Sequence, residues 1–544
     1  MSLERLLEFD IPLTKILDEL DGLSAISLAN TSLLVNGAVY KNLSGNRGNR
    51  YWAQRCEHWR EDPVLLKVLA SYDPIFPKMV NRDLQECRVE FDWGEAFLAA
   101  HDVGFTIRSC NWTLRSFKEF QDRIKTDIVV RYDDSSLSRD YPCRFTGTSG
   151  SLAWNILCPG TDKRNNPETV LVFEDMAVCR GAKVADHDRV LMSFVMLLPR
   201  VDDEEVRPLV KKVDRALVWR LLVSVGDTFV QISPMHEGES CRILLEQYVF
   251  IGHKHEMDPV VSHCKDIIAI WSSPYSLKVY KVWVEFSGNV NADVIAQVDV
   301  SEETKRIFMG RLWSRMAQAV NSFVFAVEAN NEACDANEAG GNKIDLTVTF
   351  PGAGRIYSLS LHGDQAVHGS ELQCHPEPSS LGNEQLEGIA FAHGLRVYYT
   401  SQLLGISRNG DSWYFRPWKE FNFRLQPGAE PDVTLLEIIG PTLLVIVSEE
   451  IMYFVEVSLF ACSPAAEKED SVNLQDPGLT LDIIRIINLR LCNILKQIKH
   501  LHLDFSNGVP YIWLEANRIK LTDEGAVVID EHPCSFDLYR LDFY

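Results

Sequence analysis

Three histidines and a cysteine in the middle of the sequence are residue types that could bind a metal. His253, His255, His263 and Cys264 supply imidazole and thiolate groups, which zinc prefers as ligands. Their spacing matches neither the paired ligands of structural zinc sites nor the H-E-x-x-H pattern of metalloproteases. We therefore interpret them as loop histidines near the end of a strand, and we predict no metal site.

Polar residues near the C-terminus are similar to the catalytic and metal-binding loops of protein kinases. Asp504 and Asn507 lie in LHLDFSN, and Asp523 lies in LTDEG. Kinases separate the Asp and Asn by more residues and need a glycine-rich loop with an upstream lysine, and neither is recognisable here. The common phosphate-binding and serine-nucleophile motifs are absent too. We predict two strands joined by a turn at residues 523–525, no enzymatic activity and no cofactor.

Charge and composition restrict the kinds of partner. The chain has 544 residues, a formal net charge of -22, 46% hydrophobic residues and 24% charged residues. This is the composition of a folded protein that is long enough for two or more units. Nucleic-acid binding needs clustered Lys and Arg, and no such run occurs. We predict a neutral or basic protein partner and no nucleic acid.

The compartment is predicted from cysteine usage and from apolar segments. The 13 cysteines are scattered without C-x-x-C pairs, which is typical of reduced thiols in the cytoplasm or the nucleus. The N-terminus does not have the pattern of a signal peptide. The most apolar stretch, residues 433–457, is interrupted by glutamates and by Gly440-Pro441. We predict no membrane association and a cytoplasmic or nuclear location.

Helical spacing dominates the start of the chain. Ile16, Leu17, Leu20 and Leu23 recur at intervals of three and four residues, which places them on one face of a helix. Further helices are predicted at residues 63–72, 93–101 and 116–126. We therefore divide this part into a helical module, residues 1–60, and a helical linker, residues 61–126, followed by a β-rich body, residues 127–544.

Strand spacing dominates the rest of the chain. Apolar and polar residues alternate over residues 344–350, and apolar runs flank short turns in a recurring hairpin pattern. The hairpins are predicted at residues 267–284, 389–399 and 443–457, with weaker copies at 170–178 and 526–541. This recurrence favours a β-propeller over the alternative, a large β-sandwich. Insertions are predicted as loops at 330–342, 367–385 and 463–478 and as helices at 302–320 and 479–503.

The N-terminal segment resembles an F-box. The sequence ILDELDGLSAISLANTS, residues 16–32, is similar to the middle of that family, with an apolar pair, a further Leu, a short turn and a second apolar helix. YWAQRC, residues 51–56, is similar to its last element. Family members usually place a Leu-Pro pair about seven residues before the apolar pair, whereas here Ile11-Pro12 lies four residues before Ile16.

The resemblance implies a substrate receptor of a cullin-RING ubiquitin ligase, of the SCF type. The F-box would dock on the adaptor protein of the ligase, and the β body would hold a protein substrate that the sequence does not identify. The fold class is then α+β and multidomain, with a small all-α F-box-like module before a mostly β body. Two alternatives stay open, a helical hairpin that only caps the body and a propeller scaffold unrelated to ubiquitin. The candidate adaptor-binding residues, which would insert into a partner groove, are Pro12, Ile16, Leu17, Leu20 and Leu28.

Overall fold

The computed structural model describes most of the regular elements of residues 1–544. The described residues are 10–20, 22–29, 33–43, 45–56, 62–71, 93–116, 145–147, 152–157, 168–174, 177–183, 190–199, 218–226, 228–235, 238–245, 260–273, 276–285, 287–299, 326–330, 345–352, 355–362, 372–374, 388–400, 402–408, 414–418, 433–448, 451–459, 479–489, 498–506, 508–517, 519–521, 527–529 and 536–544.

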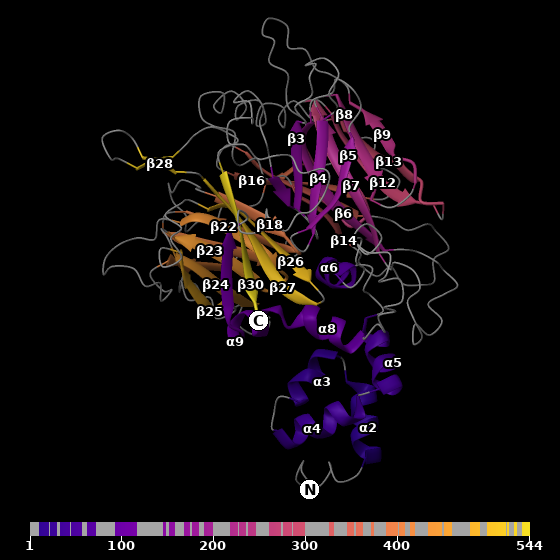
Figure 1. Cartoon of the computed structure of the whole chain (residues 1–544), viewed down its shortest axis with the longest axis vertical. Helices are drawn as coiled ribbons and strands as arrows, with labels where there is room; N and C mark the ends of the chain where they lie inside the picture. Colours follow the sequence, from indigo (N-terminus) through magenta and orange to yellow (C-terminus); the bar gives the residue numbers. More distant parts are fainter. Residues whose placement is uncertain are drawn as a thin grey trace, which may run out of the picture.

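The N-terminal part of the described chain is helical. Its helices, drawn in indigo and violet in Figure 1, are α2 (Asp10–Glu19), α3 (Gly22–Ala29), α4 (Leu33–Asn42), α5 (Gly45–Arg55), α6 (Pro63–Ser71), α8 (Trp93–His101) and α9 (Val103–Ser109). The helices predicted at residues 63–72 and 93–101 are confirmed. The longest described helix has 11 residues, and none of those described is long and apolar enough to cross a lipid bilayer.

All described strands except β28 and β29 form four-stranded antiparallel sheets, which we call blades and number in chain order. The described residues form seven such blades. Blades 1 to 3 are β2 (Phe145–Gly147), β3 (Leu152–Leu157), β4 (Glu168–Glu174) and β5 (Ala177–Lys183); β6 (Val190–Pro199), β7 (Val218–Gly226), β8 (Phe229–Pro234) and β9 (Cys241–Leu244); and β10 (Val260–Cys264), β11 (Ile267–Ser273), β12 (Ser276–Val284) and β13 (Val290–Asp299).

Blades 4 to 6 follow the same order along the chain. They are β14 (Ala326–Asn330), β15 (Asp345–Gly352), β16 (Arg355–His362) and β17 (Leu372–Cys374); β18 (Gly388–Ala392), β19 (Leu395–Tyr399), β20 (Leu403–Arg408) and β21 (Tyr414–Pro417); and β22 (Val433–Gly440), β23 (Leu443–Ser448), β24 (Ile451–Leu459) and β25 (Leu479–Asn488). The hairpins predicted around residues 170–178, 267–284, 389–399 and 443–457 are confirmed by the pairing of their strands.

Blade 7 joins the two ends of the β body. It contains β26 (Ile498–Ser506), β27 (Val509–Asn517), β30 (Phe536–Phe543) and β1 (Trp112–Ser116). The register of β1 against β30 runs from Trp112↔Phe543 to Ser116↔Tyr539. The β body therefore begins before residue 127, which corrects the predicted boundary. β1 was not predicted because its partner, β30, is distant in the sequence and the segment itself has only a weak strand pattern.

The predicted C-terminal hairpin, residues 526–541, is wrong in its pairing. β29 (Val527–Ile529) pairs with β28 (Ile519–Leu521) in a separate two-stranded sheet, whereas β30 pairs with β27 and β1. The apolar runs were read correctly as strands. The partners of these strands were predicted wrongly, because antiparallel pairing depends on contacts outside the segment.

The order of the blades is that of a β-propeller. Contacts join the first strand of one blade to the first strand of the next, as between β10 and β14, β18 and β22, and β22 and β26. In Figure 1 the strands progress from magenta through orange to yellow around the body, with α6 seen end-on near the middle. This connectivity, with each blade a meander of neighbouring strands, favours the propeller over the sandwich.

The helix predicted over residues 479–503 is wrong. Residues 479–488 form β25, which pairs with β24 from Leu459↔Leu479 to Ile451↔Asn488, and β26 begins at Ile498. The isoleucine-rich run fits a helical period, but β-branched side chains pack well on a sheet and a partner strand is available. β17 lies within the loop predicted at 367–385. Of the helix predicted at 116–126 and the loop predicted at 330–342, only Ser116 and Asn330 are described, and they end strands β1 and β14. The helix predicted at 302–320 and the loop predicted at 463–478 lie outside the described residues.

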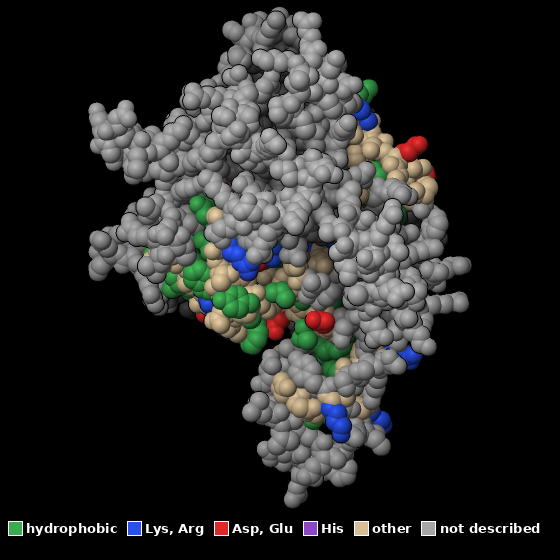
Figure 2. Space-filling model, in the orientation of Figure 1, with side chains coloured by type: hydrophobic (Ala, Val, Ile, Leu, Met, Phe, Trp, Pro, Cys, Tyr) green, Lys and Arg blue, Asp and Glu red, His purple; other side chains and the backbone are tan. Residues whose placement is uncertain are grey.

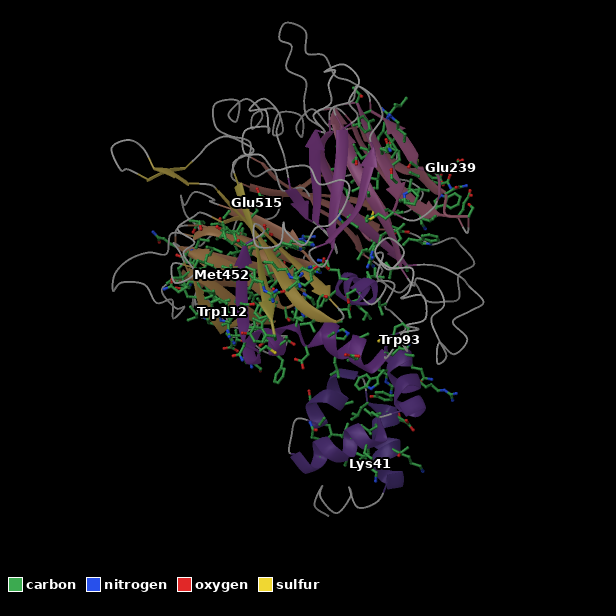
Figure 3. All side chains as sticks on the ribbon, viewed as in Figure 1. Lys41, Trp93, Trp112, Glu239, Met452 and Glu515 are labelled. Carbon is green, nitrogen blue, oxygen red and sulfur yellow. The ribbon has the colours of Figure 1, made fainter. Side chains whose placement is uncertain are left out.

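One apolar core runs through the helices and blades 2, 6 and 7. Its buried members include Trp93 in α8 and Met452 in β24, which Figure 3 labels in the two parts of the molecule. On the face drawn in Figure 2, the described apolar side chains gather where the strands meet the helices. Two smaller cores lie between blades, one shared by β6–β9 with β10–β13 and one shared by β18–β21 with β22–β25.

Deleting residues 536–544 is expected to cause aggregation. The deletion removes β30, which lies between β1 and β27, together with Leu541 and Phe543, which are 0% and 2% exposed. Two strand edges lose their partner, and unpaired edges template association. Size-exclusion chromatography would detect the loss of monomer. The matched control is Tyr544→Ser, which changes a 64% exposed side chain at the same end and should stay monomeric. A monomeric deletion variant would contradict this role of β30.

Candidate functional site

The side chains expected to bind an adaptor have different environments. Ile16 is 37% exposed on α2, whereas Leu17 is 1% exposed. Leu20 and Leu28 are partly buried against the same core as Leu17. Pro12 lies in α2, and its side chain is outside the described part. Of the four described side chains, only Ile16 is exposed. Leu17 packs inside the protein, which was the alternative to adaptor binding for these residues. Binding of an adaptor stays a prediction.

The C-terminal end of α2 is held by α5. The hydroxyl of Tyr51 donates to the carbonyl of Leu20 at 3.1 Å, and the guanidinium of Arg55 donates to the carbonyls of Leu20 and Asp18, each at 2.8 Å. Arg55 also lies 4.1 Å from the centre of the Tyr51 ring. These donors satisfy carbonyl groups that a helix end leaves unpaired. The segment predicted as the last F-box-like element therefore fixes the orientation of α2 and of Ile16.

Cys56, at the end of that element, is a packing residue. Its free thiol is 2% exposed, and burial, reinforced by the charge of Asp62, raises the pKa of the thiol to about 12. The reactive thiolate is therefore not formed near neutral pH. Beside it, the rings of Trp52 and Phe97 lie 5.0 Å apart and join α5 to α8.

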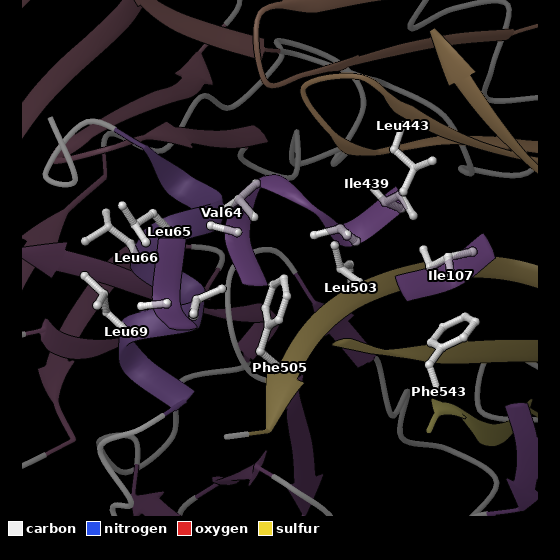
Figure 4. Close-up of a cluster of buried hydrophobic side chains, with 14 of the residues drawn as sticks. Val64, Leu65, Leu66, Leu69, Ile107, Ile439, Leu443, Leu503, Phe505 and Phe543 are labelled. Carbon is white, nitrogen blue, oxygen red and sulfur yellow. The ribbon is translucent and has the colours of Figure 1, made fainter. Parts of the chain in front are cut away.

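Helix α6 is the element that joins the helices to the blades. Every side chain from Val64 to Ala70 is buried, which is the pattern of a helix enclosed on all sides. The helix contacts β26 of blade 7 and β6 and β7 of blade 2. Figure 4 shows its leucines beside Leu503 and Phe505 of β26. Asp62 caps its start by accepting the amides of Val64 and Leu65 at 2.9 and 3.1 Å.

Polar contacts fix α6 in this position. The ammonium of Lys67 donates to the carbonyl of Leu503 at 3.0 Å, and the amide of Gly508 donates to the hydroxyl of Ser71 at 3.0 Å. The guanidinium of Arg220 in β7 donates to the carbonyl of Ala70. Blades 2 and 7 therefore both bind the C-terminal half of the helix.

Lys67 is a buried charge with one acidic neighbour. Burial lowers the pKa of Lys67 to about 8, while the negative charge of Asp504 acts in the opposite direction. Asp504 is 2% exposed and accepts the hydroxyl of Tyr511 at 3.0 Å and the amide of Phe505 at 2.8 Å. A buried ammonium is costly unless it is hydrogen-bonded and near an opposite charge. Here the Leu503 carbonyl accepts a hydrogen bond from Lys67, and Asp504 supplies the opposite charge.

A second contact ties the helices to blade 6. Arg108 of α9 forms an ion pair with Glu456 of β24 at 2.8 Å. The guanidinium of Arg485 in β25 donates to the carbonyls of Ile107 and Arg108 at 3.3 and 3.0 Å. Arg108 is half exposed, so its ion pair contributes little to stability, and the two hydrogen bonds at the helix end carry the orientation.

Only some of the residues considered for metal or phosphate chemistry are described. His263 and Cys264 lie in β10, and His253 and His255 fall outside the described residues. Within the described ranges, no three His, Cys, Asp or Glu side chains are placed to hold a metal ion. The kinase-like segment contains strands β26, β27 and β28, and β28 pairs with β29. The turn predicted at residues 523–525 lies outside the described residues.

Sequence reasoning missed the part played by α6. The helix was predicted, but as part of a linker, and Lys67, Asp504 and Arg220 were not singled out. The signal available was PVLLKVLAS, which is apolar around most of a helix and has a single lysine, so it is typical of an enclosed helix. Its partners lie 436 and 150 residues away along the chain and give no local signal.

Comparisons with known proteins give likenesses of fold alone. No protein-family model matches the chain, and no curated protein matches it in sequence. Among solved structures, the WD40 domain of SCAP from fission yeast covers 80% of this chain and 98% of its own, at 7% identity and a TM-score of 0.35. The Dos1 propeller covers 73% and 92%, at 8% identity and a TM-score of 0.32.

A third structure is the β-propeller domain of Cps50 (Swd1) from Myceliophteria thermophila. It covers 59% of this chain and 92% of its own, at 9% identity and a TM-score of 0.30. Two of the three are described as propellers, and the SCAP structure is described as a WD40 domain. At these scores, the assignment of this chain to the β-propeller class rests on its own blade order and strand pairing.

Leu69→Ala is expected to destabilise the junction. Leu69 is 1% exposed in α6, and truncating an enclosed leucine costs about 2–5 kcal/mol. Thermal unfolding followed by circular dichroism should show a lower midpoint. The matched control is Phe105→Ala in α9, because Phe105 is 58% exposed and its truncation should leave the midpoint unchanged. Equal midpoints for both variants would show that α6 does not carry the junction.

Proposed function

We propose that this protein is a non-enzymatic interaction scaffold in which the helical module and the propeller act as one body. The observation that carries the proposal is the enclosure of α6, which gives the helices and blades 2, 6 and 7 a common core. A common core fixes the distance and angle between two binding surfaces. An adaptor or scaffold needs this property, because each partner must be held at a set position.

The β body supplies one of these surfaces. Propellers present loops at the two ends of their blades, and loops on a rigid support are the usual place for binding residues. The net charge of -22 favours a neutral or basic protein over nucleic acid. Reduced thiols, represented by free Cys56, Cys110 and Cys241, support a location in the cytoplasm or the nucleus.

A second, finer function is the one that the F-box-like segment implies. On this proposal the helical module docks on the adaptor of a cullin-RING ubiquitin ligase, and the propeller holds the substrate. The observation that favours it is Ile16, a large apolar side chain that stays exposed on a helix whose end is fixed by Tyr51 and Arg55. Exposed apolar anchors on rigid helices are typical of helix-in-groove recognition.

The scaffold proposal is tested by co-purification of the tagged full-length chain from native cells. Proteins cross-linked to the chain should map to the blade loops, and their recovery should persist in washes at raised salt, because a specific interface does not depend on surface charge alone. If no protein cross-links to the blades, the scaffold function is contradicted.

Ile16→Asp is expected to abolish binding to the purified adaptor while leaving thermal stability unchanged. A carboxylate buried in an apolar groove without a partner is too costly for a small interface to retain. The matched control is Phe105→Asp, the same kind of change at an exposed aromatic on another helix, which should keep adaptor binding. Pull-down by the full-length chain measures both. Failure of the unsubstituted chain to bind the adaptor excludes the ligase function and leaves the scaffold function in place.

A further inference from the structure

Blade 3 carries an exposed tryptophan on its last hairpin, which is formed by β12 and β13. Trp283 is the penultimate residue of β12 and is 41% exposed. Its neighbours Tyr280 and Val282 are buried in the core shared with blade 2. Because alternate side chains of a strand point to opposite faces, Trp283 lies on the face of β12 away from that core. Tryptophan is among the residue types most enriched at the centres of protein interfaces.

The indole ring of Trp283 is held in place by β13. Its Nε1 donates a hydrogen bond to a carboxylate oxygen of Asp293 at 2.9 Å. Asn291 lies directly opposite Trp283 in the register of the two strands, and Asp293 lies two residues further along β13 on the same face. The orientation of the ring is therefore set before a partner binds, which reduces the conformational entropy that binding would lose.

A second carboxylate is fixed on the other side of the indole ring. Glu285 follows β12, and its amide donates to the carbonyl of Asn289 at 2.9 Å, so the strand pairing continues to this residue. Two residues separate Glu285 from Trp283 along the strand, which places both side chains on one face. The exposed carboxylate of Glu285 accepts hydrogen bonds from Ser287 at 3.0 Å and from Asn289 and Asn291 at 3.3 Å each. The ring thus lies between two oriented acidic groups.

The turn between β12 and β13 is fixed to blade 2. The amide of Val290 donates to the carbonyl of Glu239 at 3.0 Å, and the amide of Glu239 donates to the side-chain oxygen of Asn289 at 3.1 Å. Gly238 and Gly288 approach so closely that a Cβ at residue 238 would meet the carbonyl of Gly288. Figure 3 labels Glu239 at the outer edge of these blades, and Figure 2 shows acidic side chains at the same edge. The turn is therefore a firm support that carries a further exposed carboxylate.

The charge of this face favours a basic partner. Lys281 of β12 lies on the face of Trp283, and its ammonium is 3.7 Å from a carboxylate oxygen of Asp266. The charges of this ion pair balance each other, so the carboxylates of Glu285 and Asp293 leave the face negative. A cation is attracted to the face of an indole ring, and neighbouring carboxylates strengthen the attraction. Arginine suits both features, because its planar guanidinium stacks on aromatic rings and binds carboxylates through several N–H groups.

We propose that the face formed by Trp283, Glu285 and Asp293, which we call the blade 3 face, binds a basic segment of a protein partner. An arginine side chain of that segment lies on the indole ring between the two carboxylates. The proposal rests on the scaffold function and adds the binding surface and the chemistry of one partner of the β body.

Binding of a defined peptide to the full-length chain tests the proposal. The probe is a fluorescein-labelled peptide of alternating Gly and Arg, and its control carries citrulline, which has the shape of arginine without the charge. Fluorescence anisotropy at physiological salt measures both affinities. The arginine peptide should bind at least about tenfold more tightly than the citrulline peptide. Equal affinities, or no binding of the arginine peptide, would overturn the proposal.

Substitutions of Trp283 assign the binding to the indole ring. Trp283→Phe keeps an aromatic face, whereas Trp283→Leu keeps an apolar side chain without one. Affinity for the arginine peptide should fall in the order Trp, Phe, Leu, with the Leu variant roughly three- to thirtyfold weaker than the unsubstituted chain. A loss of apolar contact alone would not follow this order. Equal affinity of Trp283→Leu and the unsubstituted chain would overturn the proposal.

Glu285→Gln tests the acidic part of the blade 3 face without changing Trp283. This variant should bind the arginine peptide about two- to fivefold more weakly. The matched control is Glu95→Gln, which removes an exposed carboxylate from α8 and should leave the affinity unchanged. Equal effects of the two variants would show that the peptide responds only to the overall charge, and would overturn the proposal. Proteins cross-linked to other blade loops, together with a peptide that does not distinguish these variants, would overturn the blade 3 face and leave the scaffold function in place.

Discussion

Helix α6 has the side chains of Val64 to Ala70 buried between the helices and the blades, and the relation of the two parts depends on that burial. Each enclosed Val or Leu contributes about 1.5–3 kcal/mol relative to an exposed position. The hydrogen bonds of Lys67, Ser71 and Arg220 give this apolar contact a fixed orientation. Without α6, the described contacts between the parts would be mainly those of α9 with blade 6.

Blade 7 imposes a second constraint, because it is completed by strands from both ends of the body. β1 follows directly after α9 in the sequence and pairs with β30, so the helices and the last strand are fixed to each other. The backbone of Asn111 and Tyr544 extends this pairing by two hydrogen bonds of 2.9 Å. The helical module is therefore positioned by the same blade that joins the ends of the chain, and Ile16 is presented at a defined place relative to the blade loops.

Because Lys67 is buried, the stability of the junction between α6 and the blades depends on polar contacts as well as on apolar packing. An apolar side chain at this position would avoid the cost of burying an ammonium. The lysine instead depends on its hydrogen bond to the Leu503 carbonyl and on the negative charge of Asp504. By contrast, the cores between blades 2 and 3 and between blades 5 and 6 consist of apolar side chains.

Local patterns in the sequence determined the helices at 63–72 and 93–101, most hairpins and the propeller class, because helix and strand periods act within a few residues. Contacts between segments distant in the sequence decided the features that local patterns did not predict. Leu479–Asn488 became a strand because β24 offered a partner, and β1 joined the body because β30 lies beside it. Leu17 packed inside while Ile16 stayed exposed. The site around Lys67 draws on residues hundreds of positions apart, so only folding could bring it together.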